Sequence, residues 1–219
     1  MDKESRVSEN LANEYLQAAL AGDEDACLRM ARQCAIDLEG LHEFYVGLIQ
    51  PTQYEVGAMW EEGRISVATE HLATATNTFV SLTAYAPFAR TTAGGPRAIV
   101  ACTQGEYHEL GARLTADLLE CDGWDVTFLG ATMPVRDLLQ AVEERKPQVV
   151  GLSAALTQHL GSVKMLVASI RGEFRDSCPP IVVGGNAFRD LAEVWRLVEA
   201  DGYAPDASGA VELLRQFRA

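Results

Sequence analysis

The sequence predicts an α/β protein in which an N-terminal four-helix bundle precedes a Rossmann-like (flavodoxin-like), doubly wound sheet of five parallel strands. Residues 8–90 have apolar positions at helical spacing and no strand-like run. From residue 97 onward, short apolar runs alternate with helix-like segments, the pattern of a parallel sheet covered on both faces. We therefore place a cap domain at 1–90, a linker at 91–96 and an α/β domain at 97–219.

Four helices with short connections are expected in the cap, as in an antiparallel bundle. The first covers "ENLANEYLQAALAG" at 9–22, and the second extends from residue 26 to about residue 49. Pro51 suits the first turn of the third helix, which Gly63 ends. The fourth helix extends from about residue 65 to residue 90.

The second domain reads as strands alternating with helices. The expected strands are Ala98–Cys102, Val126–Leu129, Val149–Leu152, Ile181–Val183 and a weaker one near Asp201–Tyr203. The expected helices lie at about 109–121, 135–145, 159–172, 187–199 and 207–218. Right-handed crossovers place the carboxyl ends of all strands on one edge, where ligands bind beside the topological switch point.

The composition argues against several classes of protein. The net charge of -13 disfavours direct nucleic-acid binding by this chain, because such binding depends on Lys and Arg. No long apolar run predicts a membrane span, and the polar start "MDKESRVSEN" is not typical of a secretory signal. The five cysteines form no CxxC pair, which indicates reduced thiols in a cytoplasmic protein and no zinc cluster.

Polar side chains and glycines follow the strands at this edge. The loop after the first strand holds Glu106, His108 and Gly111, the loop after the third holds Ser153 and Thr157, and the loop after the fourth holds Gly184, Gly185 and Asn186. Glycines there let a bulky ligand approach the backbone. An FMN or phosphate pocket is the alternative, but no GxxxxGK loop is present.

His108 is the candidate metal-binding residue of this pocket. A neutral imidazole binds transition metals, and a carboxylate such as Glu106 commonly fixes its second nitrogen. No second histidine or acidic cluster completes a ligand set, and His159 is expected to face solvent. Because protein metal sites usually use three or four protein ligands, a macrocyclic cofactor would have to supply the others.

The pattern Glu106-x-His108-x-x-Gly111, then Ser153 with Thr157, then Gly184-Gly185 resembles the signature of cobalamin-binding domains. The resemblance implies that His108 is the lower axial ligand of cobalt and that the nucleotide tail enters a slot between sheet and helix. It implies a cofactor site formed by Glu106, Tyr107, His108, Glu109, Gly111, Ser153, Ala155, Thr157, Gly184, Gly185 and Asn186. Glu106 replaces the more common aspartate, and Ala155 replaces the leucine of Ser-x-Leu.

The cap has a second pattern, Trp60 followed after nine residues by Glu70-His71. It is similar to that of adenosylcobalamin-dependent photoreceptor regulators related to MerR-type proteins, and implies that these residues contact the adenosyl group. Glu61 stands where a histidine is often found in those proteins, so we do not expect a stable bis-histidine product. We also expect no DNA-binding domain in this chain.

The resemblance implies an adenosylcobalamin-dependent light sensor whose cap or oligomeric state changes after light breaks the cobalt–carbon bond. Its partners would be a second copy of the chain, in a homo-oligomer, or a separate output protein. The main alternative is a corrinoid methyl carrier that binds methylcobalamin between two methyltransferases. A third is a subunit of an adenosylcobalamin-dependent radical enzyme, or a photochemical enzyme.

Overall fold

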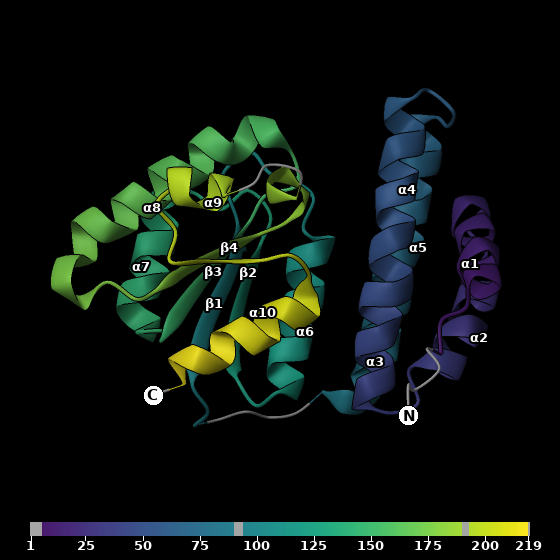
Figure 1. Ribbon diagram of the computed structural model, residues 1–219, viewed down its shortest axis with the longest axis horizontal. Helices are drawn as coiled ribbons and strands as arrows, with labels where there is room; N and C mark the ends of the chain where they lie inside the picture. The colour runs from purple at the N-terminus through teal and green to yellow at the C-terminus, as the bar shows by residue number, and fades with distance from the viewer. Residues whose placement is uncertain (1–5, 90–93, 190–192, 219) are drawn as a thin grey trace. The chain divides into compact units, whose positions relative to one another are not determined.

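A computed structural model describes residues 6–89, 94–189 and 193–218 of the chain. It divides the chain into two compact units, Met1–Ala89 and Arg90–Ala219. The first unit is helical and the second contains a five-stranded parallel sheet, which confirms the predicted fold class (Figure 1). Three residues of the expected 91–96 linker lie outside the described residues. Among the described residues, no helix has the length and apolar character needed to cross a membrane.

The first unit starts with two short helices, α1 (Glu9–Ala21) and α2 (Glu24–Cys34). The hydroxyl of Ser8 accepts a hydrogen bond from the third residue beyond it and so caps α1. Gly22 ends α1 with a φ of 69°, a left-handed conformation that glycine adopts readily. Both helices pack against α5 (Val67–Tyr85), a longer helix that continues into a 3₁₀ turn, Ala86–Phe88.

The expected boundary between the second and third helices was wrong. The chain breaks after Cys34, and α3 (Leu38–Phe44) begins beyond Asp37, whose carboxylate accepts a hydrogen bond from the backbone N–H of Gly40 at 2.7 Å. Asp37 also pairs with Arg6 at 2.7 Å. This break depends on a residue about thirty positions away, which helical periodicity does not report.

Pro51 lies in the first turn of its helix, as expected, but that helix continues directly from the helical segment before it. α3 passes through a π-helical turn, Tyr45–Ile49, directly into α4 (Gln50–Glu61). Proline has no N–H to donate to the fourth residue before it, and its ring crowds that carbonyl. The wider π turn just before Pro51 is the local adjustment that lets the helix continue.

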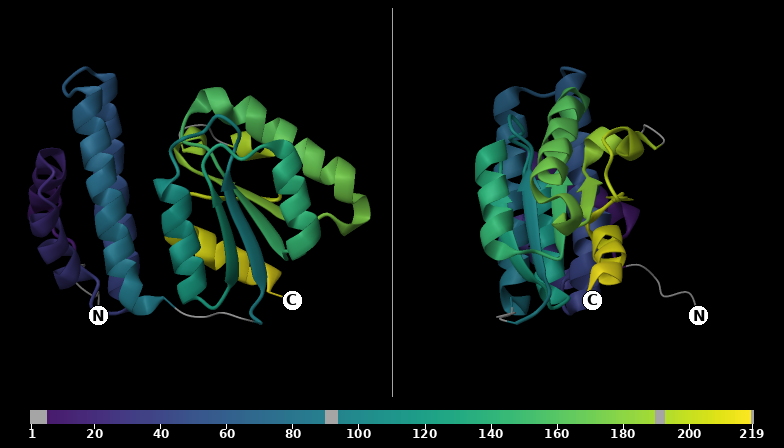
Figure 2. Two further views of the ribbon diagram at one scale, coloured as in Figure 1. Left: turned by 180° about the vertical axis from the view of Figure 1, so that it is seen from behind. Right: turned by 90° about the vertical axis from the view of Figure 1, so that its left-hand side faces the viewer.

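The second unit has its five strands in the order β2-β1-β3-β4-β5, all parallel (Figure 2). The strands are β1 (Arg97–Cys102), β2 (Asp125–Gly130), β3 (Val149–Ser153), β4 (Ile181–Gly184) and β5 (Gly202–Ala204). β1 lies between β2 and β3, so the strand order reverses there. The loops that follow β1 and β3 therefore flank the topological switch point of the sheet.

Helices cover both faces of this sheet. α6 (Leu110–Cys121) and α10 (Ala207–Leu214) pack together on one face, whereas α7 (Val135–Arg145) and α8 (Leu160–Phe174) pack together on the other (Figure 1). Ile99 and Ala101 of β1 point into the main core with Leu138 of α7 and Val163 of α8. This alternation along β1 is what the pleat of a strand requires.

The helix expected at 187–199 is not continuous. Its described parts are a 3₁₀ turn, Asn186–Phe188, and the short α9 (Val194–Leu197). Glu193 has a φ of 61°, which a right-handed helix cannot contain. The last predicted helix also changes, since α10 ends at Leu214 and a 3₁₀ turn follows it.

Candidate functional site

The switch point brings a buried carboxylate, Glu106, between two loops. Cys102 of β1 is in register with Ser153 of β3, and the N–H of Thr103 donates to the carbonyl of Ser153 at 3.3 Å. The loops after these two strands therefore begin side by side. The side chain of Glu106 comes from the first loop and is fully buried between them.

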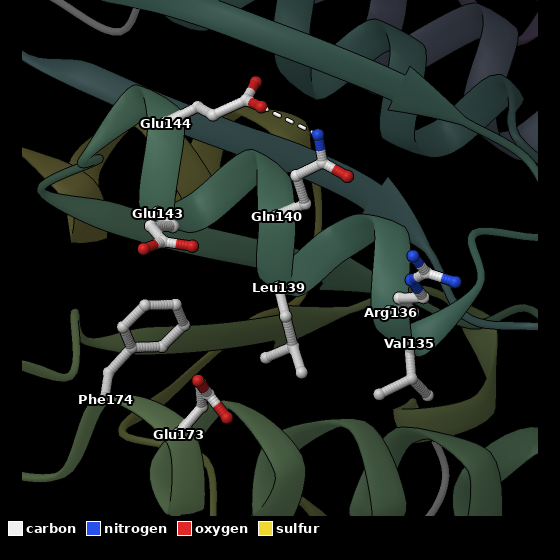
Figure 3. A pocket seen from close by; sticks show the side chains of 8 residues that line it. All are labelled: Val135, Arg136, Leu139, Gln140, Glu143, Glu144, Glu173 and Phe174. Atoms are coloured by element: carbon white, nitrogen blue, oxygen red, sulfur yellow. Dashed lines mark hydrogen bonds between the residues drawn. The ribbon is translucent and has the colours of Figure 1, made fainter.

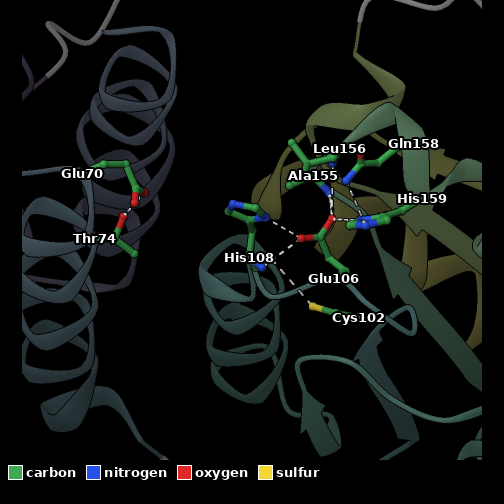
Figure 4. Close-up of polar contacts among 9 residues, drawn as sticks. All are labelled: Glu70, Thr74, Cys102, Glu106, His108, Ala155, Leu156, Gln158 and His159. Atoms are coloured by element: carbon green, nitrogen blue, oxygen red, sulfur yellow. Dashed lines mark hydrogen bonds and ion pairs between the residues drawn. The ribbon is translucent and has the colours of Figure 1, made fainter. Parts of the chain in front are cut away.

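Both carboxylate oxygens of Glu106 accept hydrogen bonds (Figure 4). Its Oε1 atom lies 2.9 Å from the backbone nitrogen of His108 and 2.5 Å from Nδ1 of the same residue. Its Oε2 atom accepts from the backbone N–H groups of Ala155 at 2.8 Å and Leu156 at 3.3 Å, and lies 2.8 Å from Nδ1 of His159. One carboxylate thus joins the loop after β1 to the loop after β3.

This environment keeps Glu106 ionised. Burial by itself would raise the pKa of the carboxyl group, because burial disfavours the charged form. Hydrogen bonds from the side chain and backbone of His108, from His159 and from the backbone of Ala155 act in the opposite direction and outweigh it. The net result is a pKa of Glu106 well below its ordinary value.

His108 is oriented by this carboxylate. Nδ1 faces Glu106, and the other ring nitrogen, Nε2, points away from it (Figure 4). The side chain is about half exposed, at 52%. In a neutral imidazole that donates through Nδ1, the lone pair is on Nε2, which is the arrangement a metal-binding histidine needs.

The structure corrects the expectation about His159. His159, expected to face solvent, has a side chain only 14% exposed and contacts the same carboxylate as His108. A second histidine thus shares the carboxylate that contacts His108. Its position in the loop after β3, at the same sheet edge, was the available signal. Within the described part of the chain, no three His, Cys, Asp or Glu side chains form a group that could hold a metal ion by themselves.

Tyr107 and Glu109, the neighbours of His108, differ in surroundings. The side chain of Tyr107 is 76% exposed. Glu109 accepts a hydrogen bond from the backbone N–H of Ala131 at 2.7 Å, while the backbone carbonyl of Glu106 accepts one from Thr132 at 2.9 Å. Glu109 therefore connects its loop to the loop after β2, and its contact with a cofactor stays a prediction.

The glycines of the predicted pocket differ in the room that each has for a side chain. Gly185 has a φ of 98°, and a Cβ there would lie 2.3 Å from the carbonyl oxygen of Ala154. A Cβ on Gly184 would lie 3.2 Å from the carbonyl oxygen of Ala204. A Cβ on Gly111 would meet no heavy atom within 4 Å. Only Gly111 therefore borders open space, whereas the glycine pair lets the chain approach itself.

The remaining predicted residues of this unit lie at the same sheet edge. Ser153 ends β3 and is partly buried, and Ala155 follows it with its N–H on Glu106. Thr157 begins a 3₁₀ turn, Thr157–His159, and is exposed, as is Asn186 in the loop after β4. The structure thus groups the residues predicted in the second unit around the switch point.

The predicted cap residues belong to the first unit and lie at one end of the α4–α5 pair. Trp60, in the last turn of α4, is 46% exposed. Glu70, near the start of α5, has a side chain only 13% exposed; it accepts a hydrogen bond from the hydroxyl of Thr74 at 2.8 Å (Figure 4). The exposed His71 has Nε2 at 3.5 Å from Glu70. Their contact with a ligand held by His108 stays a prediction.

Two hollows are found elsewhere on the described surface. One, of about 700 Å³, lies between α7 and α8 and contains both apolar and acidic side chains (Figure 3). The other, of about 280 Å³, lies between the ends of α2 and α5. Neither is lined by a predicted site residue, so the slot for a nucleotide tail stays a prediction.

Comparison with known proteins gives this arrangement its chemistry. The family model described as "B12 binding domain" matches residues 96–212, more than half of the chain. The chain belongs to the B12-binding domain family. A second model with the same description matches residues 11–80, in the helical unit. The protein is therefore a cobalamin-binding protein with an N-terminal helical cap domain.

Transcriptional repressors and corrinoid proteins are both among the relatives of this B12-binding protein. It is 32% identical over 204 residues to the HTH-type transcriptional repressor CarA of Myxococcus xanthus, and 33% identical over 144 residues to CarH of the same organism. These alignments cover 91% and 65% of this chain, but only 65% of CarA and 46% of CarH. The dimethylamine corrinoid protein of Methanosarcina barkeri is 24% identical over 216 residues, covering 96% of this chain and 99% of that protein.

Solved structures support the fold of both units. The monomethylamine corrinoid protein of Methanosarcina barkeri superposes with a TM-score of 0.80 at 15% identity, covering 96% of this chain and 99% of that one. A cobalamin-binding protein from Desulfitobacterium hafniense gives a TM-score of 0.53 at 23% identity, covering 95% of this chain and 98% of that one. At these identities the likeness concerns the fold alone.

The residues at the switch point fit cobalamin. The corrin macrocycle brings most of the metal's ligands, so the protein needs to offer one well-oriented donor. His108 offers an imidazole whose Nδ1 is held by an ionised, buried carboxylate. Gly111 lies in the first turn of α6, directly after the loop of His108, and borders open space.

Proposed function

We propose that this cobalamin-binding protein is an adenosylcobalamin-dependent light sensor. The observation that carries the proposal is the pair Glu70-His71 with Trp60 at one end of the cap, where Trp60 and His71 are exposed and Glu70 is held by Thr74. The 32% identity to CarA extends over 91% of this chain and so includes both the helical unit and the cofactor domain.

In this proposal His108 holds the cofactor from below. Its Nε2 atom would be the lower axial ligand of cobalt, and Glu106 would keep that nitrogen unprotonated by accepting from Nδ1. Adenosylcobalamin, when bound, would supply a cobalt–carbon bond that light can break. Gly111, Ser153 and the loops after β3 and β4 would border the rest of the cofactor.

The cap would respond to the loss of the upper ligand of cobalt. Trp60, Glu70 and His71 would contact the adenosyl group in the dark, and these contacts would no longer be available after illumination. A ligand shifts a conformational equilibrium only through contacts that differ between the two states, and the adenosyl group supplies such a difference. We propose that the output is a change in homo-oligomerisation or in binding to a separate regulatory protein, without direct nucleic-acid binding by this chain.

Illumination of the reconstituted protein tests this proposal. The protein is loaded with adenosylcobalamin in the dark, and its absorption spectrum and oligomeric mass are measured before and after light. The proposal expects the absorption spectrum to change, and the oligomeric mass to change as well if the output is homo-oligomerisation. An unchanged spectrum and an unchanged mass would reject the sensor while leaving cobalamin binding intact.

A corrinoid methyl carrier is the second candidate. It is favoured by the dimethylamine corrinoid protein, which this chain covers over 99% of its length. A carrier needs its cobalt to be reached by partner enzymes, whereas a cap with Trp60 over the cofactor would obstruct them. Binding of methylcobalamin at least as tight as that of adenosylcobalamin, with demethylation by a partner methyltransferase, would favour the carrier.

A further inference from the structure

We infer that His159 is a positioning residue for His108 and acts through the carboxylate that the two histidines share. The inference rests on the proposed role of His108 as the cobalt ligand. Nδ1 of His159 lies 2.8 Å from Oε2 of Glu106, and Nδ1 of His108 lies 2.5 Å from Oε1. The two imidazoles therefore contact opposite oxygens of one buried carboxylate.

The two carboxylate oxygens of Glu106 contact different parts of the chain. Oε1 faces only its own loop, through the backbone and ring nitrogens of His108. Oε2 faces the loop after β3, through the N–H groups of Ala155 and Leu156 and the ring of His159. Holding Oε2 fixes the rotation of the carboxylate and thereby fixes the direction in which Oε1 accepts from His108.

The contribution of His159 to this arrangement differs from that of the backbone. Its ring, 14% exposed, covers a carboxylate whose own exposure is 0%. Without the ring, Oε2 would keep two backbone donors, at 2.8 and 3.3 Å, but would gain access to water. We therefore expect removal of the ring to preserve the fold and loosen the carboxylate.

Loosening the carboxylate should be visible at His108. A firm acceptor at Nδ1 holds the proton there and leaves the lone pair on Nε2. A mobile or hydrated acceptor lets the imidazole populate the other tautomer, in which Nε2 carries the proton and cannot bind a metal. His159 would thus set the fraction of molecules in which His108 is ready to coordinate cobalt.

Three substitutions of one residue separate this role from simple packing. His159→Asn places an amide N–H near the position of Nδ1 and keeps a donor for Oε2. His159→Gln places its amide near the position of Nε2 and keeps size without that donor. His159→Ala removes the ring. Gln158→Ala is the control for the other ring nitrogen, because the exposed Gln158 side chain lies 3.5 Å from Nε2 of His159 and its loss leaves the Nδ1 contact with Glu106 in place.

The first readout uses the protein without cofactor. Long-range ¹H–¹⁵N spectra of the histidine rings report the tautomer of His108, and the chain has only four histidines. We expect the Nδ1–H form in the unsubstituted protein, in His159→Asn and in Gln158→Ala, and a mixture of tautomers in His159→Ala and His159→Gln. The same tautomer of His108 in all five proteins would overturn the inference.

The second readout uses the protein loaded with cobalamin and measures the fraction with histidine nitrogen on cobalt by visible spectroscopy. We expect this fraction to fall in His159→Gln and to be restored in His159→Asn. Equal fractions in these two variants would also overturn the inference. If the unsubstituted protein showed no histidine coordination, the proposed role of His108 would fail instead, and the tautomer measurement would still decide the role of His159. Should His159→Ala not fold, the Asn and Gln pair makes the same comparison.

Discussion

Glu106 and His108, two residues apart in the loop after β1, are joined twice: the carboxylate lies 2.9 Å from the backbone nitrogen of His108 and 2.5 Å from its Nδ1. The first contact fixes the position of the His108 backbone, and the second fixes the orientation of its imidazole ring. A short loop thus holds one ring nitrogen of His108 against the carboxylate and directs the other, Nε2, away from it (Figure 4).

Replacing Glu106 with Gln should destabilise the second unit by about 3 kcal/mol, because the charged acceptor of several buried donors is lost. The effect should depend on pH. The folded-state pKa of Glu106 lies below the ordinary value of 4.5, so its contribution is complete above that pH and is lost as the pH falls below it, where the unfolded chain takes up the proton first. Urea unfolding of both proteins from about pH 7 to about pH 3 measures this. A difference that stayed constant over that range would contradict the assignment.

Two glycine substitutions should separate packing from ligand binding. Gly185→Ala should cost about 3 kcal/mol or more, because the added Cβ would lie 2.3 Å from the carbonyl oxygen of Ala154 and the φ is 98°. Gly111→Ala should leave stability unchanged or raise it by up to about 1 kcal/mol, since the site is helical and open.

Gly111→Ala should lower cobalamin affinity although it does not lower stability. A methyl group in the open space beside the loop of His108 should weaken binding by about tenfold, which corresponds to about 1.4 kcal/mol. Equilibrium titration of folded Gly111→Ala with cobalamin measures it. Unaltered affinity would show that the cofactor does not use this space.

The sequence was sufficient for the features that local patterns encode. Alternating apolar runs and helices predicted the five strands and the edge at which their loops meet, because parallel crossovers leave one arrangement of strand ends. The pair Glu106 and His108 was also predictable, since its members are two residues apart. What failed was non-local. The contact of His159 with Glu106 spans 53 residues and depends on the adjacency of β1 and β3.

The errors in helix boundaries have similar causes. The break after Cys34 is stabilised by Asp37 and by Arg6, which comes from the start of the chain. The break also needs glycine at position 40, because a Cβ there would lie 2.1 Å from the carbonyl oxygen of Cys34. Pro51 does lie in the first turn of α4, but a π turn that local sequence patterns do not predict joins this helix to α3.

The buried ion pair of α6 should be important for stability. Arg113 lies 2.7 Å from Asp117, whose side chain is fully buried. Arg113→Met should destabilise the protein by about 3 kcal/mol, because it leaves a buried charge without its cation. Arg113→Met with Asp117→Leu should recover most of that loss, since a matched apolar pair can replace a buried ion pair. Denaturant unfolding compares the two, and equal losses would contradict the ion pair's role.

The cap should discriminate between upper ligands of cobalt. Trp60→Ala should change stability by less than about 1 kcal/mol, because the side chain is 46% exposed. It should lower the preference for adenosylcobalamin over methylcobalamin by about tenfold. Phe79→Ala is the matched control, an aromatic residue of the cap with a similar exposure of 44%. If both variants kept the original preference, Trp60 would have no role at the upper ligand.

Electron paramagnetic resonance of the protein loaded with cob(II)alamin tests the assignment of His108 most directly. An axial nitrogen splits the cobalt lines into triplets when it is ¹⁴N and into doublets when it is ¹⁵N. In protein labelled with ¹⁵N only in histidine, we expect doublets, and we expect His108→Ala to lose them. Triplets in the labelled protein would mean that the cofactor's own base is the ligand, and doublets that persist in His108→Ala would assign the bond to another histidine; either result would contradict the account.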